Sequence, residues 1–466
     1  MPRDSEVAPV DLPAFGMPDA EPGVPAAVYR DRLDRLRERA REAGYDAFVV
    51  YGDREHFANI AYLTGYDPRF EEALLVLGDG APALVVGNEG EGYVDTSPVA
   101  DEFDVQLFQS FSLLGQDRSA SPGPREMLRR AGVGAGDRVG VAGWKHFTAQ
   151  EVADPATTLE VPAYLAGALR ELAGDRPRVE NANALLMDSS EGMRATSGVD
   201  QLARFEFAAC HTSRSVWQVL DGVEPGMTEH EAVQLMAYTG IPLSCHLMLS
   251  AGERAWMGLP SPTTRTIERG DPLTTAYGNW GALNARAGWV VEGRAGLPEG
   301  VRDYVEVLVA PYFEAIAEWY DRLAIGVEGR RLYDAVHDTI GDPFFGVELN
   351  PGHLIHLDEW VDSPVYEGST EQLRSGMAVQ ADVIPATGTD YFTTNVEDTV
   401  ALADRELRRA FADRYPGAWD RVQARRQFMQ GTLGFDLAPE VLPFSNIPGY
   451  LPPYLLSPER AMVLAG

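Results

Sequence analysis

The chain has 466 residues, 45% of them hydrophobic and 23% charged, which is ordinary for a globular protein that can bury large cores. Its 70 acidic and 39 basic residues give a formal net charge of −31, and such a surface repels nucleic-acid phosphates and anionic membranes. Two cysteines exclude a disulfide-rich scaffold and a cysteine-rich zinc module. Without a long apolar run or a leader-like N-terminus, we expect a soluble cytoplasmic protein that binds neither nucleic acid nor membranes.

The N-terminal segment, residues 1–27, is rich in proline, glycine and acidic residues and predicts an extended arm. A helix is predicted to follow it directly, because Leu33, Leu36 and Ala40 have the spacing of one helix face. Gly44 is typical of the residue just past the end of a helix, so the helix is expected to stop there.

Short apolar runs then alternate with helical patterns. Residues 45–52 form a run of the strand type. Residues 73–78 and 81–87 are expected to pair as a hairpin through the glycine-containing turn at 78–80. This alternating order predicts an α/β domain with a mixed sheet over residues 28–190.

The second half of the chain has longer helical patterns. Residues 199–223 predict a long amphipathic helix. Residues 226–240 predict a second helix, which opens on a capping box made by Thr228 and Glu231. Strand-like segments follow, with a further helix predicted at 303–323.

Three polar residues in strand-like surroundings of this half are candidates for chemistry. His353 is followed along the chain by Asp382 and then by Glu397. One histidine and two carboxylates are the residue set of a hard-metal site or of acid–base catalysis. Each residue alone is more often a structural polar group, so the prediction depends on the three coming together.

In order and spacing, these three segments resemble the M24 family, which includes methionine and proline aminopeptidases, prolidase and creatinase. Residues 57–78 are similar to the N-terminal domain of the creatinase and prolidase branch, and residues 194–232 to its inter-domain helix and the turn after it. The resemblance covers about residues 30–405. It implies an α/β creatinase-like N-terminal domain at 28–190 and an α+β pita-bread domain, with a proline-rich C-terminal tail, at 191–466.

The chain departs from the family at the metal ligands. The family's metallopeptidases hold two ions with two Asp, one His and two Glu residues. Here His353 and Glu397 match, Asp382 stands at a Glu position, and alanine occupies both Asp positions, as Ala276 and Ala287. Two nearby divalent ions need several carboxylates to offset their repulsion. We therefore expect no bound metal and no other cofactor.

The creatinase branch is also metal-free, and the resemblance implies hydrolysis of a C–N bond by acid–base catalysis. The loop histidine of that branch aligns with Leu259 here, so creatinase itself is a poor match, and His246 is the nearest substitute. The resemblance leaves His353 as the expected acid or base, with Asp382 and Glu397 as its electrostatic partners.

Other polar and aromatic residues are expected to bind the substrate. Because side chains alternate along a strand, Cys245 and His246 are expected to point to opposite faces, and so are His353 and His356. Aromatic walls beside carboxylates suit a cationic guest through cation–π attraction. The expected substrate-binding residues are His246, His356, Tyr277, Trp280, Asn284, Trp289 and Arg69.

Arg69 lies near the place where the creatinase branch uses an N-domain arginine to hold a substrate carboxylate across a dimer. The resemblance therefore implies a homodimer, in which the N-terminal domain of one subunit covers the pocket of the other.

The leading hypothesis is a metal-independent enzyme that hydrolyses a C–N bond in a small amino-acid-like, guanidino or amidino compound. A biosynthetic elimination or rearrangement would use the same residues. Loss of both Asp positions, the loop histidine and a later histidine, replaced by Trp360, supports a non-catalytic binding protein as the alternative. A second alternative is a single-metal metallopeptidase of the Xaa-Pro type.

Overall fold

The computed structural model describes residues 4–174 and 178–465, so the first three residues of the arm and the last residue of the tail lie outside the described residues. The chain divides into two compact units. Val24–Ala195 forms the N-terminal unit, and the described residues before and after it form the C-terminal unit.

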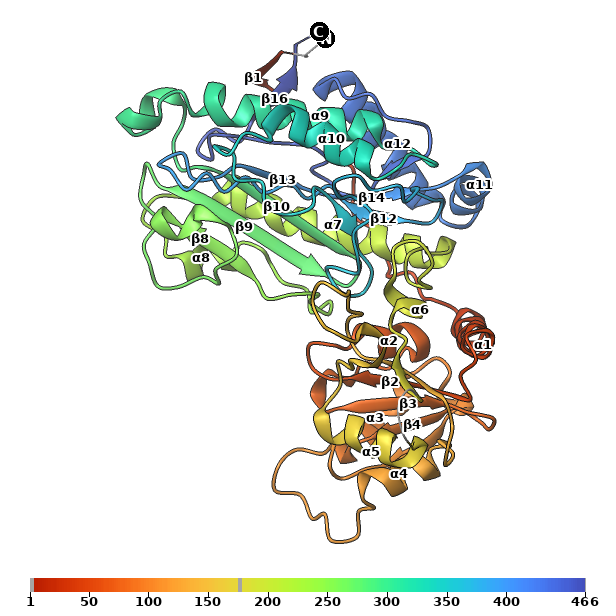
Figure 1. Cartoon of the computed structure of the whole chain (residues 1–466). Helices are drawn as coiled ribbons and strands as arrows, with labels where there is room; N and C mark the ends of the chain where they lie inside the picture. The colour runs from red at the N-terminus through yellow and green to blue at the C-terminus, as the bar shows by residue number, and fades with distance from the viewer. Residues whose placement is uncertain (1–3, 175–177, 466) are drawn as a thin grey trace. The chain divides into compact units, whose positions relative to one another are not determined.

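The N-terminal unit is built on one six-stranded mixed sheet with the strand order β5-β4-β3-β2-β6-β7 (Figure 1). The strands are β2 (Ala47–Gly52), β3 (Ala73–Leu77), β4 (Ala83–Val86), β5 (Asp104–Leu107), β6 (Val139–Ala142) and β7 (Val179–Asn181). Strands β2, β3 and β4 pair antiparallel, whereas β5, β6 and β7 join by parallel pairings. The predicted mixed sheet and the β3–β4 hairpin are confirmed.

Helices surround this sheet, and the first of them follows its predicted pattern. They are α1 (Ala26–Glu42), α2 (Ala58–Thr64), α3 (Asn88–Tyr93), α4 (Pro124–Arg130), α5 (Ala163–Ala173) and α6 (Ala184–Met187). Helix α1 buries Leu33, Leu36 and Ala40. Gly44 has a φ of +81°, the left-handed conformation that glycine adopts at helix ends, so the predicted stop is confirmed.

The C-terminal unit contains two four-stranded antiparallel sheets, ordered β13-β10-β9-β8 and β11-β12-β14-β15. Their strands are β8 (Met248–Ala251), β9 (Pro272–Asn279), β10 (Ala282–Trp289), β11 (His353–Leu354), β12 (Ala378–Gln380), β13 (Asn395–Glu397), β14 (Thr399–Leu402) and β15 (Val441–Pro443). The helices are α7 (Val199–Gly222), α8 (Glu229–Gln234), α9 (Ala310–Arg322), α10 (Arg330–Ile340), α11 (Arg405–Arg414) and α12 (Pro416–Phe428). Helix α7 packs on β9 and β10, while α9 and α10 lie side by side (Figure 1).

The predicted helices of this unit are present, with one difference in length. The capping box of Thr228 and Glu231 is formed, with Glu231 N–H donating to Thr228 Oγ1 at 3.2 Å. Helix α8 nevertheless ends at Gln234 instead of continuing to residue 240. Ala237 has a φ of +48°, which a right-handed helix cannot contain, so the prediction of the longer helix was wrong.

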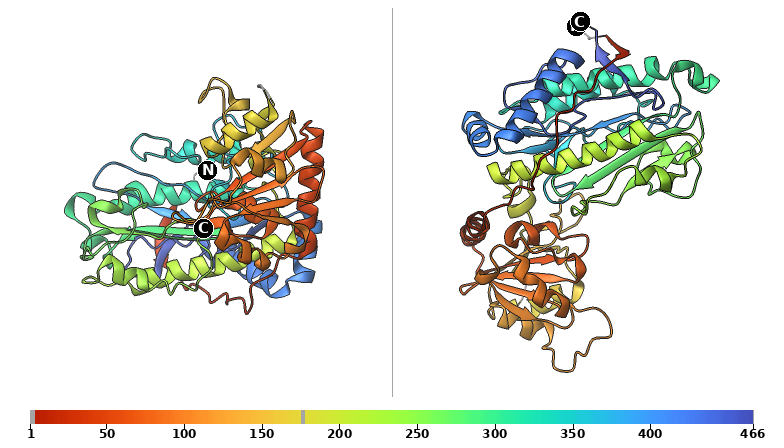
Figure 2. Two further views of the ribbon diagram at one scale, coloured as in Figure 1. Left: turned by 90° about the horizontal axis from the view of Figure 1, so that it is seen from below. Right: turned by 180° about the vertical axis from the view of Figure 1, so that it is seen from behind.

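The N-terminal arm belongs to the C-terminal unit. Its strand β1 (Ser5–Pro9) pairs antiparallel with β16 (Arg460–Leu464) near the other end of the chain. Figure 2 shows the segment after β1 running along the surface of this unit. There the ring of Phe15 packs edge-on against Phe428 of α12, and Asn446 Nδ2 donates to the Gly16 carbonyl oxygen at 3.0 Å.

The turn that joins β9 and β10 requires a glycine. Gly281 has a φ of +97°, and a Cβ at this position would lie 2.0 Å from Cδ1 of Phe205 on α7. We expect Gly281→Ala to lower the free energy of unfolding by about 2–3 kcal/mol, from backbone strain and overpacking together.

Denaturant titration of Gly281→Ala beside Gly326→Ala checks this prediction. Gly326 has a φ of +85°, and a Cβ added there would have no neighbouring atom within 4 Å, so its replacement isolates the cost of backbone strain. Equal losses in the two variants would show that contact with Phe205 contributes nothing.

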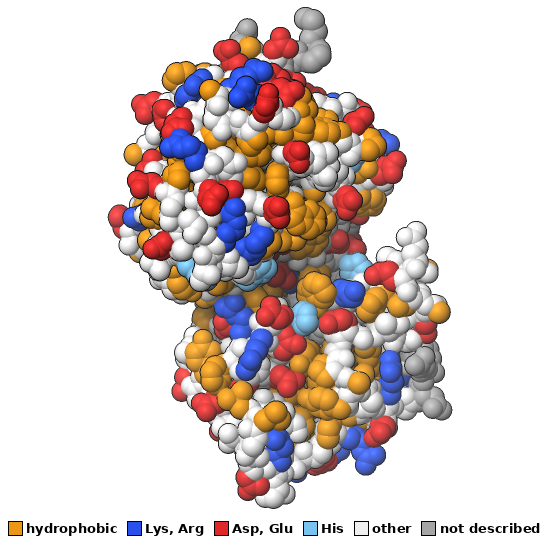
Figure 3. All heavy atoms as spheres, turned by 90° about the vertical axis from the view of Figure 1, so that its left-hand side faces the viewer, with side chains coloured by type: hydrophobic (Ala, Val, Ile, Leu, Met, Phe, Trp, Pro, Cys, Tyr) orange, Lys and Arg blue, Asp and Glu red, His pale blue; other side chains and the backbone are white. Residues whose placement is uncertain are grey.

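The chain has a large excess of acidic residues, and its charged side chains of both signs are mixed on the face that is drawn. On the face shown in Figure 3, acidic side chains are interspersed with basic and apolar ones. Among the described residues, no helix combines the length and apolar character needed to cross a membrane. The cytoplasmic location stays a prediction.

Candidate active site

A row of side chains across one sheet forms the floor of a cavity of about 270 Å³ in the C-terminal unit. Met248 of β8 pairs with Ala276 of β9, Ala276 with Ala285 of β10, and Ala285 with Glu397 of β13. Directly paired residues share one face of a sheet, and all four line the cavity. The row presents one carboxylate beside two methyl groups and a thioether.

The adjacent row contains no carboxylate. Thr274 pairs with Ala287, and Ala287 pairs with Asn395, with the threonine and the asparagine lining the cavity. Ala276 and Ala287 are the positions at which the family resemblance implies aspartates. Because a methyl group offers no ligand atom, the residues present do not fit a two-ion metal centre.

His353 lies just behind the cavity wall, fully buried. Its Nδ1 is 3.3 Å from the Leu354 carbonyl oxygen, which can only accept, so Nδ1 carries a proton and Nε2 faces the carboxylates. Nε2 lies 3.0 Å from Glu359 Oε1 and 3.6 Å from Asp382 Oδ2. The indole of Trp360 stacks on the imidazole with ring centroids 4.0 Å apart and an interplanar angle of 17°.

A tight loop brings Glu359 over His353. The main chain closes on itself, with Leu354 N–H donating to the Asp362 carbonyl at 2.8 Å and Val361 N–H to the Leu354 carbonyl at 2.9 Å. This return places the Glu359 carboxylate, six residues along the chain, back against the imidazole. His353, Glu359, Asp382 and Glu397 are called the carboxylate–histidine cluster below.

Burial and mutual charge shift the pKa values within this cluster. Burial alone would lower the pKa of His353, but the Glu359 and Asp382 carboxylates raise it well above its ordinary value. Burial raises the pKa of Asp382, and the neighbouring imidazole opposes that rise. Burial raises the pKa of Glu397 well above its ordinary value, and the charges of Asp382 and Glu359 raise it further.

A buried ion pair supports the floor from behind. Arg286 Nη2 donates to both oxygens of Asp398, at 3.0 and 2.9 Å, and both side chains are almost wholly buried. Asn284 Nδ2 donates to Asp398 Oδ1 at 2.7 Å, and Asn284 Oδ1 accepts from Thr212 of α7 at 2.6 Å. Asn284 therefore ties strands to a helix, and the cavity lining does not include it.

The segment before β8 lines the opposite wall. His246 and Cys245 both contact the cavity, so the prediction that they point to opposite faces was wrong. The reason is that β8 begins only at Met248, and alternation does not apply to the irregular residues before it. His246 Nε2 lies 2.9 Å from the Leu259 carbonyl oxygen, and burial raises the pKa of the Cys245 thiol to about 12.

Several predicted substrate-binding residues lie outside this cavity. Of His353 and His356, only His353 joins the carboxylate–histidine cluster, and strand alternation is not what separates them, because β11 spans only His353–Leu354. His356 is buried edge-on against Phe205, 5.0 Å between centroids. The predicted binding residues that do not line the cavity are His356, Tyr277, Trp280, Asn284 and Trp289. Tyr277 packs against Tyr238, Trp289 packs between Tyr304 and Phe392, and Trp280 lies in the turn between β9 and β10. These side chains pack the unit instead of facing the cavity.

Arg69 belongs to the N-terminal unit. Its guanidinium is ion-paired with Asp67, Nη2 to Oδ2 at 3.1 Å, and lies over the Phe57 ring at 4.4 Å. Its role toward a partner subunit, and the homodimer itself, stay predictions.

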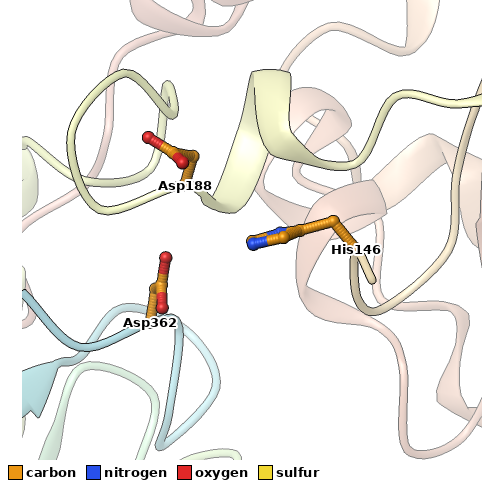
Figure 4. Close-up of side chains that lie close together, drawn as sticks. All are labelled: His146, Asp188 and Asp362. Carbon is orange, nitrogen blue, oxygen red and sulfur yellow. The ribbon is translucent and has the colours of Figure 1, made fainter. Parts of the chain in front are cut away.

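The Asp188 and Asp362 side chains each accept a hydrogen bond within a local turn. In the N-terminal unit, Asp188 follows α6 and its Oδ1 accepts from Ser190 N–H at 2.9 Å, while His146 follows β6 (Figure 4). In the C-terminal unit, Asp362, also drawn in Figure 4, accepts from Ser363 N–H at 2.8 Å. We assign none of them to a metal site.

Sequence reasoning missed Glu359 as a site residue. It stands only six residues after His353, but nothing in the local pattern shows that the loop folds back. The short apolar wall of Met257, Leu259 and Leu349 also had no local signal, since it comes from irregular segments.

Comparisons with known proteins agree with this architecture. Residues 32–143 match the creatinase/prolidase N-terminal domain. An Xaa-Pro dipeptidase from Bacillus anthracis has a similar structure, with 16% sequence identity, a TM-score of 0.59, and coverage of 81% of this chain and 96% of that one. A prolidase from Pyrococcus horikoshii OT3 gives 16% identity, a TM-score of 0.60, and coverage of 80% and 95%.

Dipeptidase PepE from Mycobacterium ulcerans is 19% identical, with a TM-score of 0.59 and coverage of 83% of this chain and 95% of that chain. No curated protein compared by sequence matches the chain. The fold class is thus the predicted one, an α/β creatinase-like N-terminal domain followed by an α+β pita-bread domain. The matches support the M24 family, and at these identities the structural likeness establishes the fold alone.

Proposed function

We propose that this chain hydrolyses a C–N bond in a small nitrogenous compound, amino-acid-like or with a guanidino or amidino group, without needing a metal ion. The observation that carries the proposal is the carboxylate–histidine cluster. An imidazole Nε2 lies 3.0 and 3.6 Å from two carboxylates at a cavity of about 270 Å³. The similarity in fold to an Xaa-Pro dipeptidase and a prolidase gives further support.

The cluster offers groups for both proton transfers of hydrolysis. Asp382 and Glu397 line the cavity, so their carboxylates touch a substrate held there. One takes the proton of the attacking water as its oxygen bonds to carbon, and the other gives a proton to nitrogen as the C–N bond breaks. His353 lies behind them and acts through Asp382 and Glu359.

The cavity selects for size and charge. A volume of about 270 Å³ is at the lower end for ligand sites, which favours a compound of a few carbon and nitrogen atoms. Glu359 and Glu397 add negative charge to walls that carry Trp360 and two methionines. Such a lining favours a neutral or cationic nitrogen group.

A compound panel tests the proposal. Chelator-treated protein is incubated with N-substituted amino acids, guanidino and amidino compounds and Xaa-Pro dipeptides, and products are measured by mass spectrometry. We expect at least one compound to be turned over, and His353→Gln to lower kcat by at least about 100-fold. The matched control is His337→Gln on α10, another histidine that stacks on an aromatic ring, at 3.8 Å from Tyr333.

The two alternatives give different results in the same panel. A non-catalytic binding protein retains a compound without converting it. A single-metal Xaa-Pro peptidase loses its activity on chelation and regains it with Mn²⁺ or Zn²⁺. Turnover that is equal in wild type and His353→Gln would remove the cluster from the reaction.

A further inference from the structure

The floor of the cavity changes from polar to apolar across the sheet. Glu397 stands on β13 at one edge and Met248 on β8 at the other, with β10 and β9 between them. Neighbouring strands lie about 4.8 Å apart, so three spacings separate the main chains of these two residues by about 14 Å. Ala276 and Ala285 present only methyl groups along the way. This stretch is long enough for a short alkyl chain.

Two further side chains extend the apolar end. Leu249 N–H of β8 donates to the Pro260 carbonyl oxygen at 3.2 Å, so Leu259 lies beside the edge of the sheet that carries Met248. Leu259 and Met257, from the same connection, both line the cavity. With Met248 they form an uncharged wall, which favours an alkyl group over a carboxylate.

At the polar end, buried oxygens lack hydrogen-bond donors. Asp382 Oδ1 and Asn395 Oδ1 have no hydrogen-bond partner among the described residues, and both residues line the cavity. They are more than nine-tenths buried, at 4% and 8% exposure. A carboxylate or amide oxygen only accepts, so a ligand that satisfies these atoms must bring N–H groups. A guanidinium brings five in one plane, whereas an ammonium brings three.

The two basic side chains of the lining are already engaged. Arg286 donates through all three of its nitrogens, to four main-chain carbonyls and to both oxygens of Asp398. His246 Nε2 lies 2.9 Å from the Leu259 carbonyl, which leaves a neutral ring only an acceptor at Nδ1. Within the described part of the chain, a ligand carboxylate in this cavity would therefore meet three carboxylates and no available cationic partner.

We propose that the substrate is an N-alkylguanidine that carries no carboxylate, with its guanidinium at Asp382 and Glu397 and its alkyl chain toward Met248 and Leu259. This inference rests on the proposed function and narrows it, because it excludes amino acids, dipeptides and guanidino acids. A guanidinium also has the electrophilic carbon that hydrolysis of a C–N bond requires, which a simple alkylammonium lacks.

The reaction on such a compound balances without another reactant. The oxygen of water bonds to the guanidinium carbon, and the bond from this carbon to the alkyl-bearing nitrogen breaks. That nitrogen ends with both protons of the water. The products are urea and an alkylammonium ion, so the positive charge is conserved.

Three probes with one heavy-atom skeleton test the substrate class. They are 3-methylbutylguanidine, 3-guanidinopropanamide and 3-guanidinopropanoate, which differ only in an isopropyl, carboxamide or carboxylate end. Chelator-treated full-length protein is titrated with each at pH 7 by calorimetry. We expect the isopropyl probe to bind most tightly and the carboxylate probe at least about 100-fold more weakly, because like charges placed together oppose binding.

A charge introduced at the apolar end should reverse this preference in part. Leu259 is 48% exposed, so an arginine there can reach solvent without a new cavity. In Leu259→Arg we expect the ratio of the two affinities to fall by at least about 10-fold, through a charge-assisted hydrogen bond to the carboxylate probe. Leu114→Arg, at a leucine of the N-terminal unit that is 93% exposed, is the matched control and should keep the wild-type ratio. Leu349→Arg, also in the lining, serves if Leu259→Arg does not fold.

Binding and urea release together separate this inference from the proposed function. Equal affinity for the isopropyl and carboxylate probes, tighter binding of the carboxylate probe, or no binding of the isopropyl probe would overturn the substrate class. Urea released from the carboxylate probe alone would uphold hydrolysis and overturn the substrate class. Selective binding of the isopropyl probe without urea from any probe would uphold the ligand class, while the proposed function would fail.

Discussion

Glu206→Gln is expected to destabilise the chain by about 3–5 kcal/mol at neutral pH, because it leaves two arginines without their buried anion. Glu206 on α7 accepts from Arg425 Nη1 at 2.8 Å and from Arg421 Nη2 at 2.6 Å, both on α12. Glu206 and Arg425 are almost wholly buried. The same helix α7 packs on the strands that carry the cavity floor.

The loss of stability caused by Glu206→Gln should become smaller as the pH falls. Burial alone would raise the pKa of Glu206, but the Arg425 charge and the Arg421 hydrogen bond hold it below its ordinary value. A group with a lowered folded-state pKa stabilises the fold above its unfolded pKa, about 4.3, and loses that contribution as pH falls through the folded value. The gap between wild type and Glu206→Gln should therefore narrow below about pH 4.3.

Denaturant titrations at pH 7 and at several values down to pH 3 measure that gap. The control is Glu306→Gln, which removes an ion pair with Arg294 whose side chains are both more than half exposed. We expect it to change stability by less than about 1 kcal/mol. A Glu206→Gln cost as small as the control, or one that grows in acid, would contradict this account of the α7–α12 contact.

Glu397→Gln is expected to lower kcat by about 100- to 10,000-fold, the range for removing an acid–base group. The glutamine keeps the size of the side chain, and its oxygen can still accept from Gln380 Nε2, which lies 3.0 Å from Glu397 Oε1. What it loses is the ability to give or take a proton at the cavity. Steady-state kinetics on a compound found by the panel provide the measurement.

The same variant should not lose stability. Burial raises the pKa of Glu397, so the fold disfavours its charged form, and a neutral isostere relieves that cost at neutral pH. We expect its melting temperature to be equal to or above that of wild type. A fall in both activity and melting temperature would indicate that Glu397 serves packing instead of catalysis.

The sequence pattern predicts the helix faces and helix ends that are determined by residues close together in the chain. Leu33, Leu36 and Ala40 set one face of α1, Gly44 ends it, and the Thr228–Glu231 box opens α8. The end of α8 could not be predicted, since residues 235–238 contain no glycine or proline to mark the turn at Ala237.

Within the candidate site, only the residues at positions that resemble the family's ligand positions could be predicted from the sequence. His353, Asp382 and Glu397 come together as expected from their order. Glu359 was missed because the loop that returns it is closed by main-chain hydrogen bonds, which leave no side-chain pattern. Tyr277 and Asn284 were assigned to the pocket from their strands, but strand register points them to packing contacts and away from the cavity.

The central claim is that water cleaves a C–N bond at the carboxylate–histidine cluster. The most direct measurement is turnover of the panel compounds in ¹⁸O-labelled water by chelated wild type and Glu397→Gln, with products analysed by mass spectrometry. The account predicts one labelled oxygen in the wild-type product and almost no product from the variant. Product without label would mean elimination or rearrangement, and no product from any compound would mean a binding protein; either result would contradict the claim.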